Sequence, residues 1–592
     1  MISCHSISVV GRGGERGGAA LENRTEKFRR ELPAVLLLLA AFAVVLWKAP
    51  LGMAIPDEAL YLTIPYRLLQ GDKLLLHEWH VTQLAGLLLL LPLRLVLALR
   101  GSTEGVLLTF RYLYVLFHSL TTLYLYLRLR RLSLSGALCA ALLYLLYAPM
   151  NIAALSYNTM GIGLLALVFV TLAVGEGRAW EAVLCGLCFA GAVLCNPYFF
   201  VLYPVYAAAA LVRALRGREG APCLRGRFVL LLTIAGAAAA LLAFGRGLWG
   251  ADLRLLRETL PAVLHGDTAE HPDRGLLSVL YGMFLSFGRN RLFLPTLGIS
   301  AVLVLCARFE KKRAAHAWAY LLTAALLSLA YGLWFRLYAN VSLNFYMFPI
   351  NILGFFAWLI PEKKRGRLFA FVFLPGFLCW FCSALASNLG FINIASVSTL
   401  NMLASAVFIC EAAAELWRTD ARGRAAAACM LLAVAVQLGL LTEGRVRFVY
   451  PMTPAAACTA RIEHGALRGL RAEPGDCARQ EAAWAAAEPI RAAEGGFVAY
   501  LTDVPGQYLD DVKRCGAYSA WFPASSAADN LPRLLEFWEL FPERVPARIA
   551  VGTENAEAAE LLLRALEARG WREYGSGGGL VLLRAEETEG MP

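Results

Sequence analysis

The chain has 592 residues, of which 59% are hydrophobic and only 17% charged, and its mean hydropathy is +0.57. A soluble protein of this size could not bury so much apolar surface, and apolar runs of about 20 residues recur along the chain. The net charge of +11 lies in short basic clusters between these runs, which is typical of cytoplasmic loops and not of a nucleic-acid surface. The composition therefore predicts a polytopic α-helical membrane protein without a nucleic-acid partner.

The N-terminal stretch differs from the rest of the chain. Residues 1–32 are polar and rich in Gly and Arg, without an apolar core, which predicts a disordered cytoplasmic tail. The apolar segment from Pro33 to Trp47 follows, and no small-residue cleavage site precedes Asp57. We therefore expect an uncleaved first transmembrane helix and not a signal peptide.

Apolar runs bounded by charges predict about thirteen transmembrane spans within residues 33–445. If the N-terminus is cytoplasmic, the basic clusters fall in inner loops, whereas the short outer loops near 150–157 and 387–396 contain no Lys or Arg. Arg336 is the one exception in a short loop. The expected spans lie near 33–49, 106–127, 133–150, 158–175, 180–196, 198–213, 228–244, 292–307, 316–334, 344–360, 368–386, 397–416 and 425–441.

Two further apolar segments test this topology. Leu84–Leu99 contains Pro92 and Arg94, and Gly275–Gly288 is short for a span. If either crossed the membrane alone, every later basic cluster would move to the outer face. We therefore expect both to lie at the interface or to re-enter, which places a large first loop, 50–105, and a second long loop, 246–291, on the outer side.

After the last span the composition becomes polar, which predicts a small extracytoplasmic α/β domain over residues 446–592. Strand-like runs lie at Phe497–Thr502, Ala547–Val551 and Gly579–Leu583, and Asn555–Gly570 has a helical pattern that ends in glycine. Of the 14 cysteines, Cys458, Cys477 and Cys515 fall in this domain without a metal-binding spacing.

The first outer loop begins with two adjacent carboxylates. The stretch "IPDEALYLTIPYRLLQGDKLLLHEWHVTQ" places Asp57 and Glu58 directly after the first span and adds a Gly-Asp pair, a lysine and two histidines. A carboxylate within reach of an acceptor hydroxyl can act as a general base. The alternative is that the two acids only solvate the exit of the first helix.

This loop resembles the GT-C superfamily of polytopic glycosyltransferases, in particular the branch with aminoarabinose transferase, protein O-mannosyltransferases and rhizobial galacturonosyltransferase-like proteins. The resemblance lies in "DEALY", "LLQGDKLL" and the span that opens "GVLLTFRYLYVLFHSL". It implies a bacterial inner-membrane enzyme that transfers a sugar from a polyprenyl-phosphate carrier to an envelope acceptor, with inversion. Asp57 would be the base or would orient it, with Glu58 beside it.

The ligands of the carrier phosphate are less defined. Relatives carry an acidic-basic pair ahead of prolines late in this loop, whereas this chain has "HEWHVTQ" and lacks the Lys-Pro-Pro pattern. Trp79 fits an interfacial anchor better than a sugar platform. The candidate phosphate ligands are Lys73, His77, Glu78, His80 and Arg111, each of which could equally be an ordinary interfacial side chain.

A second outer loop, "ALSYNTMG", offers Tyr157 and Asn158 where relatives often have an acid that assists metal binding. These groups can hydrogen-bond a sugar or a phosphate but are poor sole ligands for a hard cation. A divalent ion such as Mg²⁺ or Mn²⁺ would therefore depend on Asp57 or Glu58. The alternative is a polar turn in which the asparagine caps the next helix.

Two later segments complete the candidate site. The loop from Arg246 holds an amphipathic helix with Arg254 and Arg257, which suits a lipid phosphate, and a stretch with two histidines that we interpret as a mobile gate. The outer end of the tenth span is polar and aromatic and could line a carrier groove. The residues that we single out from these segments are Arg246, His265, Asn344 and Tyr346.

Two other functions compete with this interpretation. A transporter or flippase of a lipid-linked or anionic solute would place ionisable groups inside its spans, whereas here they concentrate in outer loops. A non-catalytic GT-C-like scaffold is compatible with the missing Lys-Pro-Pro pattern. The sugar, the acceptor and the carrier length cannot be read from the sequence.

Overall fold

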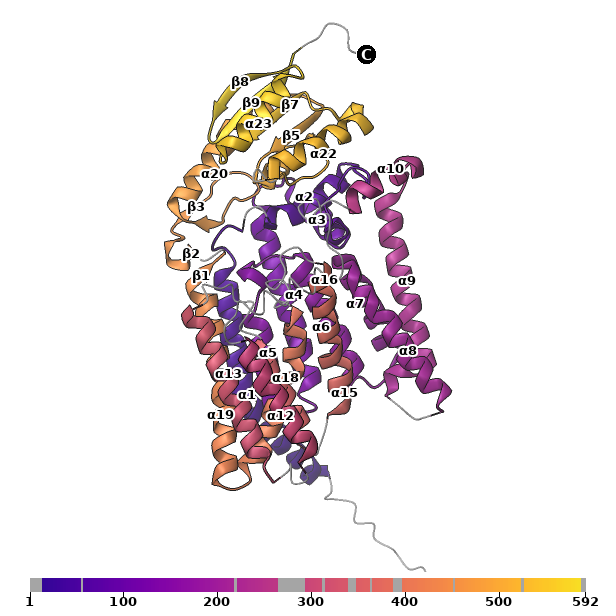
Figure 1. Ribbon diagram of the computed structural model, residues 1–592, viewed down its shortest axis with the longest axis vertical. Coiled ribbons are helices and arrows are strands. Elements are labelled where there is room, and N and C mark those ends of the chain that lie inside the picture. Colours follow the sequence, from indigo (N-terminus) through magenta and orange to yellow (C-terminus); the bar gives the residue numbers. More distant parts are fainter. Residues whose placement is uncertain are drawn as a thin grey trace, which may run out of the picture.

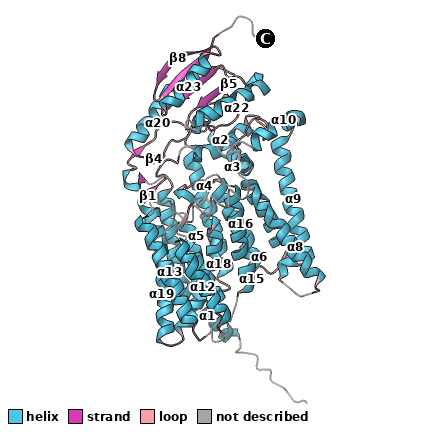
Figure 2. Ribbon diagram, viewed as in Figure 1, coloured by secondary structure: helices cyan, strands magenta, loops and turns pink. Residues whose placement is uncertain are grey.

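The computed structural model describes residues 13–54, 57–217, 221–264, 293–310, 315–338, 348–361, 365–386, 397–450, 453–522 and 526–586. Helices form a long bundle, and the strands are confined to one end of the molecule (Figures 1 and 2). The first fold prediction, a helical membrane protein with a small α/β unit at its C-terminal end, is confirmed within these residues.

The bundle helices follow one another along the chain with short connections. They are α1 (Gly13–Lys48), α2 (Asp57–Leu69), α3 (Gly86–Arg100), α4 (Val106–Leu129), α5 (Leu134–Leu146), α6 (Tyr157–Val174), α7 (Ala179–Cys195), α8 (Leu202–Leu215), α9 (Gly226–Leu248), α10 (Leu253–Leu264), α12 (Phe293–Phe309), α13 (Ala317–Tyr338), α14 (Phe348–Leu359), α15 (Gly366–Leu368), α16 (Leu374–Ala386), α18 (Thr399–Trp417) and α19 (Ala421–Arg447).

Within the described residues, ten helices are long and apolar enough to cross a membrane, and four apolar helices are shorter. Nine of the ten, together with the four shorter ones, correspond to the thirteen predicted spans. The tenth is the stretch Gln83–Arg100, which contains α3 and which we predicted not to cross. It packs mainly on α2 at the end of the bundle nearest the sheet (Figure 1), which agrees with an interfacial position.

The predicted inner loops meet at the opposite end of the bundle. Arg130 pairs with Glu31 at 2.9 Å, and Arg131 pairs with Glu176 at 2.8 Å. Arg365, from a loop more than 200 residues later, pairs with Glu411 at 2.6 Å. Contacts between these loops support the alternation of inner and outer loops, while the compartment that each end faces stays a prediction.

The N-terminal boundary differs from the sequence prediction. Helix α1 begins at Gly13, so the predicted disordered tail, 1–32, is helical from residue 13 onward, and residues 1–12 lie outside the described residues. Polar residues can extend a helix beyond the bilayer because its backbone hydrogen bonds are already satisfied internally.

The C-terminal unit, residues 448–586, contains a five-stranded sheet of order β6-β5-β7-β9-β8. Strand β5 pairs in parallel with both β6 and β7, whereas β9 is antiparallel to β7 and β8. The elements are β1 (Phe448–Val449), β2 (Thr453–Pro454), β3 (Ala460–Arg461), β4 (Arg471–Ala472), α20 (Pro474–Ala486), α21 (Glu488–Arg491), β5 (Phe497–Leu501), β6 (Arg514–Cys515), α22 (Ala527–Leu540), β7 (Arg548–Gly552), α23 (Ala556–Glu567), β8 (Trp571–Gly577) and β9 (Leu580–Ala585).

The three predicted strands and the helix of this unit are confirmed. Strands β5 and β7 are apolar along most of their length because they are central in the sheet and buried. The side chain of Asn555 caps α23 by accepting a hydrogen bond from the Ala558 N–H at 3.1 Å. Gly570, at φ +92°, follows the helix, and a left-handed residue there is easiest for glycine.

The C-terminal unit and the first outer loop share one apolar core. Leu60, Ile64 and Trp79 are buried among side chains of the sheet and of α22. The Trp79 N–H donates to the Tyr518 carbonyl at 2.8 Å. Helix α10 joins the same core, and Thr259 donates to the Leu75 carbonyl at 2.7 Å. The apolar face of the predicted amphipathic helix is thus covered by protein.

Glu181 provides a test of the helix packing at the inner end. It is fully buried, pairs with Arg128, and accepts from the N–H groups of Glu176, Gly177 and Arg178 at 2.8–3.1 Å. We expect Glu181→Ala to lower the free energy of unfolding by about 3–5 kcal/mol, because it leaves a buried guanidinium and three N–H groups unpaired.

The measurement is thermal unfolding of the purified chain in detergent. Glu176→Ala is the matched control, since Glu176 forms exposed ion pairs with Arg131 and Arg178 and should change stability by less than about 1 kcal/mol. Equal effects of the two substitutions would contradict the described packing.

Candidate functional site

Asp57 occupies the first position of α2, a helix that is buried over nearly all of its length. Helix N-termini favour negative charge because unpaired N–H groups point toward it. The Asp57 carboxyl is half-buried, and burial raises its pKa, while nearby His80 lowers the pKa and Glu58 raises it further. This side chain is therefore a stronger base than an ordinary aspartate.

Glu58, the other acid of the pair, is buried and held by an arginine. Arg111 of α4 donates from Nε and Nη2 to the two carboxylate oxygens, each at 2.6 Å. The same guanidinium donates to the carbonyls of Ala49, Leu51 and Gly52 at 2.8–3.0 Å. Arg111 thereby fastens α4, α2 and the turn after α1 together. The adjacent acids have different environments, and Asp57 is the more available.

Tyrosines gather around Asp57. Tyr61, one turn further along α2, meets Tyr157 edge-on with ring centroids 5.8 Å apart. Burial, and then the charge of Asp57, raises the pKa of both Tyr61 and Tyr450, so all these hydroxyls are neutral donors. Tyr157 thus lies near the acid pair, as the sequence analysis expected of that loop.

Asn158 is not the cap of α6. Ser156 caps this helix by accepting from the Thr159 N–H at 3.0 Å, and the Thr159 hydroxyl accepts from the Ser156 N–H in return. Asn158 lies in the first turn and is partly buried. Its amide therefore remains a candidate for binding substrate.

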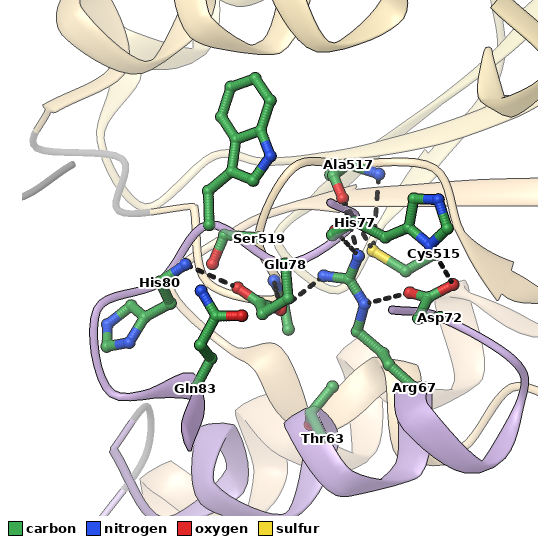
Figure 3. Close-up of polar contacts among 12 residues, drawn as sticks. Thr63, Arg67, Asp72, His77, Glu78, His80, Gln83, Cys515, Ala517 and Ser519 are labelled. Atoms are coloured by element: carbon green, nitrogen blue, oxygen red, sulfur yellow. Dashed lines mark hydrogen bonds and ion pairs between the residues drawn. The ribbon is translucent and has the colours of Figure 1, made fainter. Parts of the chain in front are cut away.

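A buried group of four charges joins the first outer loop to the C-terminal unit. Figure 3 shows Arg67 of α2 between Asp72 and Glu78, with bonds of 2.7 and 2.6 Å. Arg67 also donates to the Ala517 carbonyl at 3.1 Å, and Arg544 reaches Asp72 at 2.8 Å. All four charged side chains are less than a tenth exposed. Burial alone would raise the pKa of Asp72, but Arg67 and Arg544 hold it below its usual value.

His77 and Glu78, two predicted phosphate ligands, are engaged in this group. His77 Nδ1 accepts from the Lys73 N–H and from Arg544, each at 2.9 Å, and burial with Arg544 lowers its pKa to about 3. A neutral imidazole adds no positive charge for a phosphate. Glu78 accepts from Arg67, from the His80 N–H at 3.0 Å and from the Ala520 N–H at 3.3 Å. Both residues thus dock the loop.

His80 and Gln83 lie on the other side of Glu78 (Figure 3). The His80 ring is 5.8 Å from that of Trp521, and its Nδ1 accepts from the Thr82 N–H at 3.2 Å. The Gln83 amide oxygen accepts from the Leu75 N–H at 2.7 Å, and its amide nitrogen is buried without a partner among the described residues. His80 is the one predicted ligand of this loop whose ring lies close to Asp57.

The remaining predicted residues are not brought into this group. The Lys73 side chain is partly buried with no side-chain contact among the described residues, and Arg246 is exposed in the last turn of α9. His265, Asn344, Tyr346, the predicted gate and the segment Gly275–Gly288 lie outside the described residues.

Sequence reasoning missed Arg67 and Arg544. An arginine inside the apolar stretch "ALYLTIPYRLL" is a signal, because a buried arginine needs acidic partners. Arg544 carries no such signal, since its partner Asp72 lies 472 residues away in sequence.

A divalent metal does not find a ready set of ligands here. No three His, Cys, Asp or Glu side chains gather within the part of the chain that the structure describes. Both Glu58 oxygens are bound to Arg111, which leaves Asp57 as one carboxylate where Mg²⁺ or Mn²⁺ takes about six oxygen ligands. Metal dependence stays a prediction.

Comparisons with known proteins give one similarity. No protein-family model matches the chain, and no curated protein matches it either. Among solved structures, the chain is similar to a crystal structure of ArnT from Cupriavidus metallidurans bound to undecaprenyl phosphate, with a TM-score of 0.40 and 14% identity. The match covers 95% of this chain and 99% of that chain.

Arg544 provides a test of the docking. We expect Arg544→Met to lower the free energy of unfolding by about 3–5 kcal/mol, because Asp72 loses a buried partner. Hydrogen exchange should then accelerate at the N–H of Trp79, which bonds Tyr518 of the C-terminal unit.

Arg564→Met is the control, because Arg564 forms an exposed pair with Glu560 within one helix and should contribute less than about 1 kcal/mol. An Arg544→Met chain with unchanged exchange at Trp79 would show that the ion pairs do not hold the two parts together.

Proposed function

We propose that this protein is a membrane glycosyltransferase that moves a sugar from a polyprenyl-phosphate carrier to an acceptor at the end of the bundle that bears the C-terminal unit. The observation that carries the proposal is the separation of the acid pair. Arg111 neutralises Glu58, while Asp57 is half-buried at a helix N-terminus with a raised pKa.

In this proposal Asp57 takes the proton of the acceptor hydroxyl as that oxygen attacks the anomeric carbon. A new glycosidic bond forms, the bond from the anomeric carbon to the carrier phosphate oxygen breaks, and the polyprenyl phosphate leaves with the electron pair. The leaving group is a stable anion, so cations aid its departure and no acid is required. Attack from the opposite face inverts the anomeric centre.

The other described residues would position the base. Arg111 fixes the start of α2 through Glu58 and through three carbonyls of the preceding turn. The loop that follows β5, including η8 (Pro505–Leu509), packs on α2, with Gly506 against Ala59. The C-terminal unit thus covers the helix that carries the base, which suits a role in binding or shielding the acceptor.

Asp57→Asn tests the catalytic role. We expect transfer of sugar to envelope acceptors to fall by about 10²–10⁴-fold, because the amide cannot accept the acceptor proton. The protein should remain folded, since no hydrogen bond to the Asp57 side chain is among those of the described residues. The measurement is envelope glycan in cells that express the variant, with thermal unfolding of the purified chain.

Asn158→Ala, one turn into α6, is the control and should retain most of the transfer. Accumulation of an untransported carrier in the Asp57→Asn strain would instead favour a transporter. An unchanged glycan would contradict the proposal and favour a scaffold.

The pH dependence of transfer gives a second test. Asp57 must be deprotonated to act, so activity should fall as the pH drops through its raised pKa, at a pH above that of an ordinary aspartate. The positive charge of His80 lowers this pKa. His80→Gln should therefore move the acid limb of kcat/KM to higher pH, and a shift to lower pH or none would exclude Asp57 as the titrating base.

A further inference from the structure

Two buried cations lie where α1 and α19 end. Lys48 and Arg445 are 2% and 0% exposed. Lys48 donates to the Arg445 carbonyl at 2.6 Å and to the Phe448 carbonyl, and Arg445 donates from Nη1 to the Asn151 side-chain oxygen at 3.0 Å. Among the described residues no carboxylate pairs with either cation. Neutral oxygens therefore provide all of their described hydrogen bonds.

The guanidinium of Arg445 has one edge free. Its Nε and Nη2 are both buried and have no hydrogen-bond partner within the described part of the chain. Arg111 uses the same two atoms to bind the two oxygens of Glu58. The two arginines thus present the same fork of donors in a buried setting, and in Arg111 a two-oxygen anion fills it.

The surroundings of Arg445 are neutral. The Tyr114 hydroxyl beside it is buried and also lacks a partner among the described residues. The His118 ring stacks between Tyr114 and Tyr144, with centroids 5.2 and 4.5 Å away, and its Nε2 lies 3.2 Å from the Leu145 carbonyl. A guanidinium cannot lose its charge in a protein, and burying it without a counter-charge is costly.

These cations belong to the same end of the bundle as the acid pair. The Phe448 carbonyl is bound by Lys48 and by the Asn151 amide, the latter at 2.5 Å. Two residues further, Tyr450 is within the electrostatic influence of Asp57. Arg111 contacts the turn directly after Lys48 through the Ala49 carbonyl, 2.9 Å away.

We propose that the free fork of Arg445, the Tyr114 hydroxyl and the charge of Lys48 form a binding site for a phosphate group. A phosphate supplies two oxygens for the fork, a third for the hydroxyl, and the negative charge that the described surroundings lack. Water does not reach the fork atoms, so the phosphate enters with a movement of neighbouring side chains. The identification of this phosphate as that of the lipid carrier rests on the proposed function.

Binding to the full chain in detergent tests the site. The probes are farnesyl phosphate, farnesol and inorganic phosphate, and the readout is the ligand-dependent shift of the unfolding temperature. We expect farnesyl phosphate to stabilise the protein and farnesol not to do so. Arg445→Lys, which retains the charge and loses the fork, should weaken the phosphate affinity about tenfold or more.

Arg447→Lys is the matched control, because Arg447 lies at the same helix end and is exposed in a pair with Glu443. It should bind the probes as the unsubstituted chain does. Tyr114→Phe should fold and weaken binding to a smaller extent than Arg445→Lys, which keeps the test decisive where the arginine variant is unstable.

The outcomes separate this site from the proposed function. Stabilisation by inorganic phosphate alone, lost in Arg445→Lys, supports the site and contradicts a lipid phosphate as its ligand. Equal affinity of Arg445→Lys, Tyr114→Phe and the unsubstituted chain for farnesyl phosphate overturns the site and leaves the proposed function standing. Absence of binding by any phosphate probe also overturns the site. Asp57→Asn should bind all probes normally, since it affects the transfer step.

Discussion

The ion pair of Arg111 and Glu58 organises the end of the bundle where the candidate site lies. One guanidinium binds both oxygens of Glu58 and three backbone carbonyls of the turn between α1 and α2. A loop has no repeating hydrogen bonds of its own, so these bonds replace them and hold the turn against α4. Asp57 is adjacent to Glu58, and its position at the start of α2 follows from this anchorage.

Buried charges divide into two kinds at this end of the protein. Arg67, Arg111 and Arg544 each meet a carboxylate and serve to dock one segment on another. Asp57 and Arg445 meet no opposite charge in a described hydrogen bond or ion pair. Because an unpaired buried charge costs free energy, such groups persist where a ligand or a reaction supplies the complement. This contrast underlies both the proposed base and the proposed phosphate site.

The sequence predicted the elements better than the site. Spans and strands were recoverable because a lipid-facing helix and a central strand each impose a composition that is visible locally. The choice of His77 and Glu78 as phosphate ligands had no such local basis. Their partners, Arg67 and Arg544, turn them into docking residues, and Arg544 lies 467 residues from His77. Lys48 and Arg445 looked like ordinary charged ends of spans.

By itself, the sequence determined that the chain crosses a membrane many times, where its strands lie, and that its first loop carries an acid pair. These properties follow from hydrophobicity, periodicity and the order of residues. Only the tertiary structure decided which acid is neutralised, which cations are paired, and that the C-terminal unit covers α2. A charge acquires its role from the groups that fold next to it, and those groups come from distant parts of the chain.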